Sequence, residues 1–315
     1  MNDEPQRLRP SWKLVPVALL TAVLIYVLVG QIGEAEEFAE VLAGARWEWV
    51  LAVVGLSAVV VGLNGLRFKV VLGASGDRIR WSRAVQVVLT VWPLVLLVPA
   101  KANDLLRAAV LRDEVEPASC VGSVVAERFV DVQTLCVLGM VGCGLLGAWE
   151  WLLVLGGLWA GAWAVAGVTL ANVEGLVGLP LVQRFEEKFR ALFRGFGALR
   201  ERPGYLLGAI GVSAAAWLVS MGALWLLVGM FGAEAAPEVI LGLWPLALFV
   251  GMAPVTIGGL GTRDAVFVGL VAAAVGVGAG GQEALLAATF GYGVVMVLLP
   301  GVVGLPLMVK WLGVE

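Results

Sequence analysis

The chain has 315 residues, of which 60% are hydrophobic and only 14% are charged, whereas a soluble domain is about 45–50% apolar and about 25% charged. So large an apolar excess cannot be hidden in the core of a chain of this length, and a net charge of −3 provides no basic surface for a nucleic acid. Soluble globular, disordered and nucleic-acid-binding proteins are therefore excluded, and the sequence predicts a polytopic membrane protein.

The first apolar stretch, residues 12–30, is close to the ~20 residues that a transmembrane helix needs. Arg7, Arg9 and Lys13 lie at its start, and it precedes four glutamates within residues 34–40, without a small-residue cleavage site. We interpret it as an uncleaved transmembrane helix. Further apolar stretches lie at residues 49–66, 84–98, 118–148, 151–171, 205–231, 239–258, 265–280 and 284–309.

Basic residues are concentrated in three of the predicted loops. The amino terminus contains three, residues 67–83 contain five and residues 183–202 contain six. Because basic loops stay in the cytoplasm, we expect all three on the cytoplasmic side of the cell membrane. Three apolar stretches separate the second basic loop from the third, so one of them does not cross.

Residues 84–98 are the shortest of those three stretches, end at Pro99 and lead into a charged run at residues 101–116. We predict that they form a re-entrant segment, which enters from the cytoplasm and returns. Irregular backbone at membrane depth is tolerated only where it is buried in protein or lines a wet cavity, so a cavity is expected there.

Residues 181–202 have apolar side chains at helical spacing and basic side chains on the other sides. They are expected to form either an amphipathic helix on the cytoplasmic membrane surface or a solvated linker helix without a lipid role. In both cases this helix joins two halves, residues 1–171 and 203–315, of a single integral membrane domain.

The predicted fold is an all-α bundle of about seven to eight transmembrane helices with one or two re-entrant or broken helices. Residues 239–258 either cross the membrane, which places the carboxyl terminus inside, or form a second re-entrant segment, which places it outside. An inverted repeat of the two halves stays open.

Charged residues interrupt the apolar stretch at residues 118–148. Glu127 and Asp131 continue a polar stripe that begins at two serines, and Arg128 is placed to pair with Asp131. A charge at the centre of a membrane helix costs roughly 2.5–3.5 kcal/mol, and such residues usually face a bundle interior or a water-filled path. They form either a functional site or an ion pair that locks helices together.

Lys101, Asp104 and Arg107 are spaced by three just before this stretch. Asn103 is expected to cap a helix there. If that helix begins deep in the re-entrant turn, its free N–H groups and the two cations suit a phosphate. The alternative is an ordinary cytoplasmic helix.

A glycine-rich turn in the second half, Gly258-Gly259-Leu260-Gly261-Thr262-Arg263-Asp264, places another arginine and another carboxylate at a helix start. Thr262 is expected to cap this helix. The turn is neither a P-loop nor a dinucleotide-binding motif. Two broken apolar segments in corresponding places of two halves are typical of a transporter binding site.

The chain contains no histidine, and its three cysteines have no CxxC spacing. Imidazole bases, histidine-activated nucleophiles and histidine metal ligands are therefore excluded, and we interpret Cys120, Cys136 and Cys143 as small buried hydrophobic residues. We expect neither a metal nor another cofactor.

Three runs in this order, VPAKANDLLR at residues 98–107, ERFVD at 127–131 and GGLGTRD at 258–264, resemble the lysylphosphatidylglycerol synthase transmembrane-region family, whose members are also called flippase-like domain proteins. The resemblance extends from about residue 67 to the end of the chain. The sequence Ala102-Asn103-Asp104 departs from the family pattern, which has Gly before the acidic residue.

This resemblance implies a membrane domain that moves a lipid between leaflets. The aminoacyl-transferase domain of the namesake proteins has no counterpart here, because the chain ends directly after its last apolar stretch, so lipid aminoacylation is not expected. Relatives without that domain imply polyprenyl-phosphate-linked sugars or other envelope lipids as cargo.

Our leading hypothesis is therefore a flippase or scramblase and not an enzyme. Its cations would hold an anionic headgroup and its carboxylates would hold the cations. The candidate binding residues are Lys101, Asp104, Arg107, Glu127, Arg128, Asp131, Gly258, Gly259, Gly261, Thr262, Arg263 and Asp264. The alternatives are a scaffold subunit for an envelope glycosyltransferase and a membrane enzyme acting on a lipid phosphate. The lipid, the direction and energy source of transport, and the oligomeric state stay open.

Overall fold

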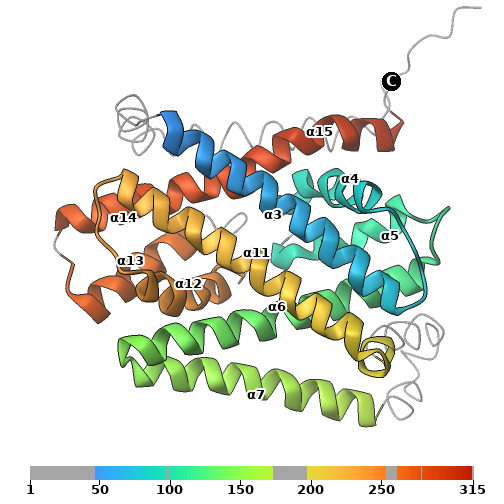
Figure 1. Ribbon diagram of the computed structural model, residues 1–315, viewed down its shortest axis with the longest axis horizontal. Helices are drawn as coiled ribbons and strands as arrows, with labels where there is room; N and C mark the ends of the chain where they lie inside the picture. The colour runs from blue at the N-terminus through green and yellow to red at the C-terminus, as the bar shows by residue number, and fades with distance from the viewer. Residues whose placement is uncertain (1–46, 97–98, 173–196, 253–260, 278, 314–315) are drawn as a thin grey trace, which may run out of the picture.

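The computed structural model describes residues 47–96, 99–172, 197–252, 261–277 and 279–313 (Figure 1). The helix predicted at residues 12–30, most of the amphipathic helix predicted at 181–202, and Gly258 and Gly259 lie outside these ranges. Predictions for those residues, including the division into two halves, stay predictions.

Every regular element of the described residues is helical. The long helices are α3 (Trp47–Ala74), α6 (Pro117–Leu146), α7 (Trp149–Ala171) and α11 (Pro203–Met230). At the carboxyl end α14 (Ala279–Gly293) continues through a π-helical turn, η4 (Val294–Leu298), into α15 (Leu299–Leu312). The short helices are α4 (Trp81–Val91), η1 (Trp92–Leu96), η2 (Pro99–Leu106), α5 (Arg107–Val110), α12 (Pro237–Gly251) and α13 (Thr262–Val275).

Five of these helices are long and apolar enough to cross a membrane. They span Glu48–Ala74, Pro117–Leu146, Trp149–Thr169, Pro203–Met230 and Gly280–Leu312. The prediction of a polytopic all-α bundle is therefore confirmed for the described residues. The helix at the stretch predicted at 284–309 begins earlier than predicted, at Ala279, and runs through η4 to Leu312 as one long helix. The helix at the stretch predicted at 265–280 is α13, which ends earlier than predicted, at Val275.

Both stretches for which broken helices were predicted are short in the structure. The first consists of α4, an α-helix of only 11 residues, followed by the 3-10 helices η1 and η2. Pro93 and Pro99 explain the break, because proline has no N–H to donate to the preceding turn. The second, α12, has 15 residues with Pro245 inside it.

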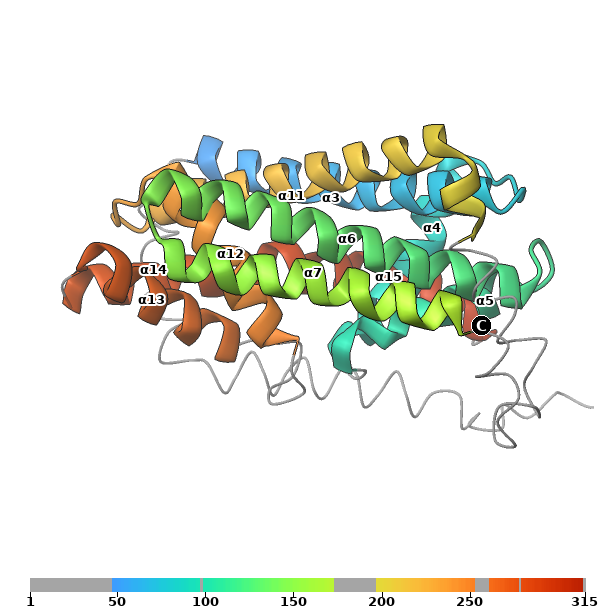
Figure 2. The same ribbon diagram turned by 90° about the horizontal axis from the view of Figure 1, so that it is seen from below.

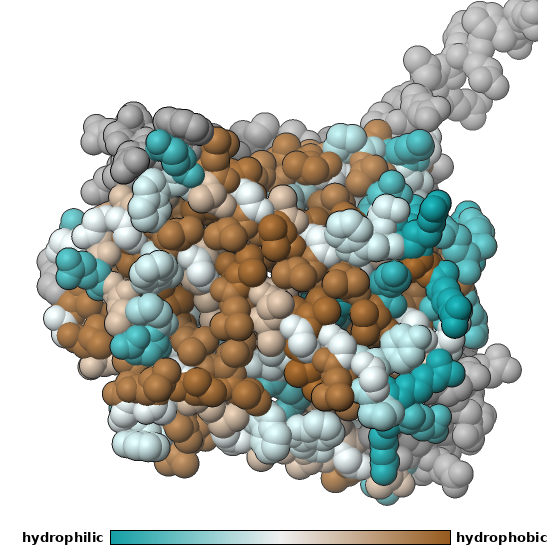
Figure 3. Space-filling model, in the orientation of Figure 1, coloured by the Kyte–Doolittle hydropathy of each residue, from teal (hydrophilic) through white to brown (hydrophobic). Residues whose placement is uncertain are grey.

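The helices pack in layers. α3 and α11 lie side by side and antiparallel, and α6 and α7 form a second antiparallel pair (Figures 1 and 2). Gly147 connects α6 to α7 with φ of 70°, a left-handed conformation that glycine adopts without a steric penalty. On the face shown in Figure 3, apolar residues cover the middle, and hydrophilic residues gather at the edge where α3 ends and α11 begins.

The start of α11 meets the end of α3 at that hydrophilic edge, where Arg202 Nη1 donates to the carbonyl of Gly73 at 3.5 Å. One part of the predicted loop 67–83 is wrong, however. α3 continues to Ala74, so Arg67 is a buried helical residue, 2% exposed, and not a loop residue.

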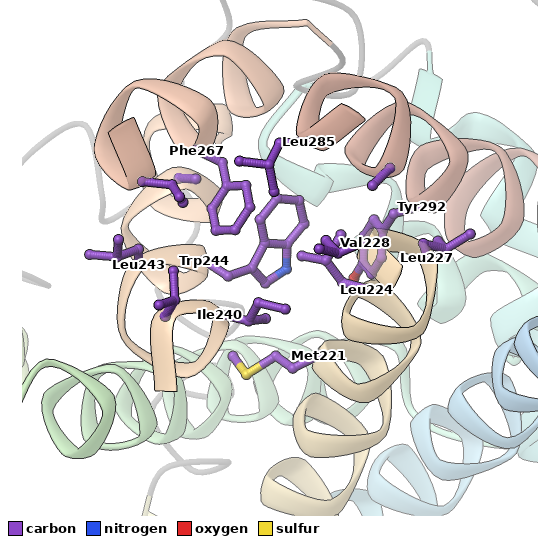
Figure 4. Close-up of a cluster of buried hydrophobic side chains, with 14 of the residues drawn as sticks. Met221, Leu224, Leu227, Val228, Ile240, Leu243, Trp244, Phe267, Leu285 and Tyr292 are labelled. Carbon is purple, nitrogen blue, oxygen red and sulfur yellow. The ribbon is translucent and has the colours of Figure 1, made fainter. Parts of the chain in front are cut away.

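The largest apolar core surrounds Trp244 of α12. Its ring makes edge-to-face contacts with Phe267 of α13 and Tyr292 of α14, with centroids 5.1 and 5.0 Å apart, and Leu224 of α11 closes the cluster (Figure 4). α12 also crosses α6 at Gly142 and Gly242, where the two backbones are in direct contact. α12 therefore packs directly against α6, whereas α13 packs against α12 and α14.

The broken segment is attached to the long carboxyl-terminal helix. Trp92 Nε1 donates to the carbonyl of Val297 at 3.1 Å, and Ser57 Oγ donates to the carbonyl of Val295 at 2.8 Å. Both acceptors belong to the π-helical turn, whose register shift leaves carbonyls for other donors. η1 is therefore held against the carboxyl-terminal helix, and α3 is bonded to the same π-helical turn.

Candidate functional site

Six charged side chains from α3, η2, α5 and α6 meet inside the bundle. We call this set the arginine cluster. It consists of Arg67, Asp104, Arg107, Glu127, Arg128 and Asp131. The positive charges of its three arginines equal the negative charges of its three carboxylates. Such a balance is expected inside a protein, because buried charges are tolerated when each is paired and hydrogen-bonded.

Glu127 is the centre of the cluster and its side chain is fully buried. Its Oε1 accepts from Arg67 Nη2 at 2.9 Å and from Arg128 Nη2 at 2.8 Å. Its Oε2 accepts from Arg107 Nη1 at 2.9 Å. One carboxylate on α6 thus positions all three arginines.

Asp131 connects the cluster to the second half of the chain. Arg67 Nη1 donates to its Oδ1 at 2.6 Å, and Arg128 Nη1 donates to its Oδ2 at 3.0 Å, which is the pair predicted from the sequence. Trp217 Nε1 of α11 donates to Oδ1 at 2.7 Å, next to Ser213.

Asp104 and Arg107, which are three residues apart, also meet, with Arg107 Nη2 donating to Asp104 Oδ1 at 2.6 Å. The expected helix cap is wrong, because Asn103 lies within the 3-10 helix η2 and its Nδ2 donates to the carbonyl of Val91 at 3.1 Å. Lys101 belongs to η2, and its predicted role stays a prediction.

Exposure distinguishes the members of the cluster. The Arg128 side chain is 25% exposed and that of Asp104 is 10% exposed, whereas Arg67 and Arg107 are each 2% exposed. Arg128 and Asp104 therefore form the accessible edge of an otherwise enclosed charge network.

Arg67 is the site residue that the sequence analysis missed. Its position directly after the predicted end of a span, at residue 66, places it among the loop cations. The available signal was the apolar run that continues after it, from Phe68 to Leu72, together with Asn64 one turn earlier, whose Oδ1 accepts from Arg67 Nη2 at 2.8 Å.

Arg263 lies in a separate centre. Its Nε and Nη2 donate to Asp264 Oδ1 at 2.9 and 2.7 Å, and its Cζ lies 4.9 Å from the Trp244 ring centroid and 5.3 Å from that of Tyr292. Such stacking stabilises a desolvated guanidinium. Among the described residues, the hydrogen bonds and the ion pair of Arg263 are made with Asp264 and the carbonyl of Thr289, and none joins it to the arginine cluster.

The start of α13 differs from the prediction in one respect. The helix begins at Thr262, and its N-cap is Gly261, with φ of 83°. The Gly261 N–H donates to Asp264 Oδ2 at 2.9 Å. Thr262 is thus the first helical residue and not the cap, and Asp264 holds both the turn and Arg263.

Helix α11 lies between the two centres. Ser213 and Trp217 contact Asp131 of the arginine cluster. Ser220 Oγ lies 2.5 Å from the Tyr292 hydroxyl and is hydrogen-bonded to it, and the ring of Tyr292 packs against Arg263. These three α11 residues form one polar stripe through an apolar helix, which links the arginine cluster to the surroundings of Arg263.

The chain was compared with known protein families, curated proteins and solved structures. A family model described as "Lysylphosphatidylglycerol synthase TM region" matches residues 14–304, which is most of the chain. No curated protein matches the chain, and no solved structure matches it.

Proposed function

Because the chain belongs to the lysylphosphatidylglycerol synthase TM-region family, we propose that it moves a lipid between the leaflets of the cell membrane. Membership makes it a membrane protein with a lipid-related function. The finer proposal is a flippase or scramblase, and not an enzyme, for an anionic phospholipid or a polyprenyl-phosphate-linked lipid. In this proposal the amino terminus is cytoplasmic.

The observation that supports this proposal is the arginine cluster. Three arginines and three carboxylates lie inside an apolar bundle, and each charge costs roughly 2.5–3.5 kcal/mol on insertion scales at a helix centre. An ion pair that only locks two helices needs one cation and one anion. The additional arginines favour a site for an anionic group.

Arg128 is the cation that an entering headgroup would meet first, because it alone of the three arginines has a substantially exposed side chain. A guanidinium binds phosphate through two parallel hydrogen bonds. Arg67 and Arg107 would add positive charge behind it, while the apolar chains of the lipid stay in the bilayer. The polar stripe of α11 would carry the headgroup toward Arg263.

We expect Arg128→Ala to slow the transbilayer movement of an anionic lipid about 10- to 100-fold, which is the value of one charged hydrogen bond, about 1.5–3 kcal/mol. The full chain is reconstituted in phosphatidylcholine vesicles with fluorescent phosphatidylglycerol, and movement is followed by quenching of the outer leaflet. Arg83→Ala is the control, because Arg83 is half-buried at the surface and its ion-pair partner among the described residues is the exposed Glu114, at 2.6 Å.

Two results would contradict the proposal. One is wild-type movement of phosphatidylglycerol in Arg128→Ala. The other is equal acceleration of fluorescent phosphatidylcholine by the wild type, because a site made of arginines must prefer an anion.

One observation favours a second candidate function. Every carboxylate of the arginine cluster is already paired with at least one arginine, as in a purely structural network. The chain would then be a scaffold subunit for an envelope glycosyltransferase. Stable co-purification with such an enzyme, together with no lipid movement in vesicles, would favour the scaffold.

A further inference from the structure

Asp104 differs from the other two carboxylates of the arginine cluster in its backbone. Glu127 and Asp131 belong to α6, a regular helix of 30 residues. Asp104 belongs to η2, a 3-10 helix of eight residues, and runs of 3-10 helix longer than three or four residues are uncommon because their hydrogen bonds have poorer geometry. Asp104 is therefore the carboxylate that can move at the smallest structural cost.

Asp104 also occupies the accessible edge of the cluster, between two arginines. Its Oδ1 accepts from Arg107 Nη2 at 2.6 Å. Its Oδ2 lies 3.4 Å from Arg128 Nε. Its side chain is 10% exposed, more than that of Asp131 at 6% or Glu127 at 0%.

A carboxylate satisfies this position incompletely. In a guanidinium the Nε–H and one Nη2–H point the same way and bind an oxyanion as a pair. Arg107 uses only Nη2 of that pair for Asp104, and its buried Nε has no hydrogen-bond partner among the described residues. Arg128 Nε likewise makes no hydrogen bond there. Two donors on either side of Asp104 are thus available to an anion with more oxygens.

We propose that Asp104 is a displaceable internal anion that holds the place of the lipid phosphate between Arg107 and Arg128. This inference rests on the proposed function. An incoming phosphate takes over the Arg107 and Arg128 donors, and Asp104 moves away with η2. Arg107 keeps its position during the exchange, because Glu127 Oε2 accepts from its Nη1 on the other side at 2.9 Å.

The displacement explains how a charge-balanced cluster binds an anion. Headgroup entry exchanges one internal anion for one external anion, so the buried arginines are never left unpaired, which would be strongly unfavourable. Departure of the headgroup lets Asp104 return, which favours release over permanent retention of the lipid.

The test is a binding measurement on the full chain in phosphatidylcholine nanodiscs, with phosphatidylglycerol as the probe and native mass spectrometry as the readout. We expect Asp104→Asn to bind phosphatidylglycerol about tenfold more tightly than the wild type, which corresponds to about 1.4 kcal/mol, because the internal competitor is gone. Glu114→Gln is the matched control, since it also removes one carboxylate from an arginine pair, but at the surface, and should leave binding unchanged.

A second measurement needs no variant and covers the case in which Asp104→Asn fails to fold. Saturation of the wild type with phosphatidylglycerol should speed hydrogen–deuterium exchange in residues 103–110, because Asp104 leaves Arg107. Unchanged or slower exchange there overturns the displacement.

The outcomes separate the two proposals. If the wild type binds phosphatidylglycerol and Asp104→Asn binds it equally or less tightly, the displacement is wrong and the headgroup site stands. An equal gain in Glu114→Gln also overturns the displacement, because the effect is then one of net charge. If the wild type binds phosphatidylglycerol no better than phosphatidylcholine, the headgroup site itself is wrong.

Discussion

Glu127→Ala is expected to lower the free energy of unfolding by about 3–5 kcal/mol, the usual result of removing one partner from a buried charge pair. The substitution leaves Arg67 and Arg107, both 2% exposed, with fewer acceptors inside an apolar bundle. It also leaves three positive charges against two negative ones. Unfolding of the purified chain in mixed micelles, followed by tryptophan fluorescence, measures this loss.

Glu114→Ala provides the comparison, because it removes the acceptor of Arg83 at the surface. The Glu114 side chain is 43% exposed and that of Arg83 is 35% exposed. An exposed ion pair contributes about 0–1 kcal/mol. Equal stability of Glu127→Ala and Glu114→Ala would show that Glu127 does not hold the arginines together.

Gly142→Ala is expected to lower the free energy of unfolding by about 1–3 kcal/mol, which is the usual cost of overpacking a close contact. A Cβ atom on Gly142 of α6 would lie 2.5 Å from the carbonyl carbon of Leu241 and 2.6 Å from Cα of Gly242. These are backbone atoms of α12, which no side-chain rotation can move. The two helices must separate, and Trp244 of α12 loses its packing around Arg263.

The control for Gly142 is Gly161→Ala on α7, where nothing lies within 4 Å of the added Cβ. Alanine in a helix interior is favoured over glycine by roughly 0.5–1 kcal/mol, so this variant should be as stable as the wild type or slightly more stable. Thermal unfolding of both variants under the same conditions measures the difference. Equal midpoints would mean that α6 and α12 do not touch as closely as the structure has them.

The candidate site was only partly predictable from the sequence. Arg128 and Asp131 are three residues apart on one helix, as are Asp104 and Arg107 along one continuous segment, so their pairing follows from local spacing. Arg67 could not be assigned in this way. Its partners Glu127 and Asp131 are 60 and 64 residues away, and a count of loop charges cannot distinguish a cation at the end of a span from one inside it.

Capping residues were also predicted from composition alone, and the structure corrects both. Asn103 and Thr262 are residue types that favour helix amino termini, but a nearby acceptor or turn decides their role. Asn103 donates instead to Val91, which is 12 residues earlier, and the positive φ of Gly261 makes that glycine the cap.

The sequence by itself determined that this is an all-α membrane protein with two interrupted apolar segments and charges buried among them. These are local properties, because the length and polarity of each stretch decide whether it can lie in a bilayer. Only the tertiary structure decided which charges meet. That choice depends on how α3, α6 and α11 are rotated and where they cross, and it places Arg67 against Glu127, keeps Arg263 in a separate centre, and leaves Asp104 at the accessible edge.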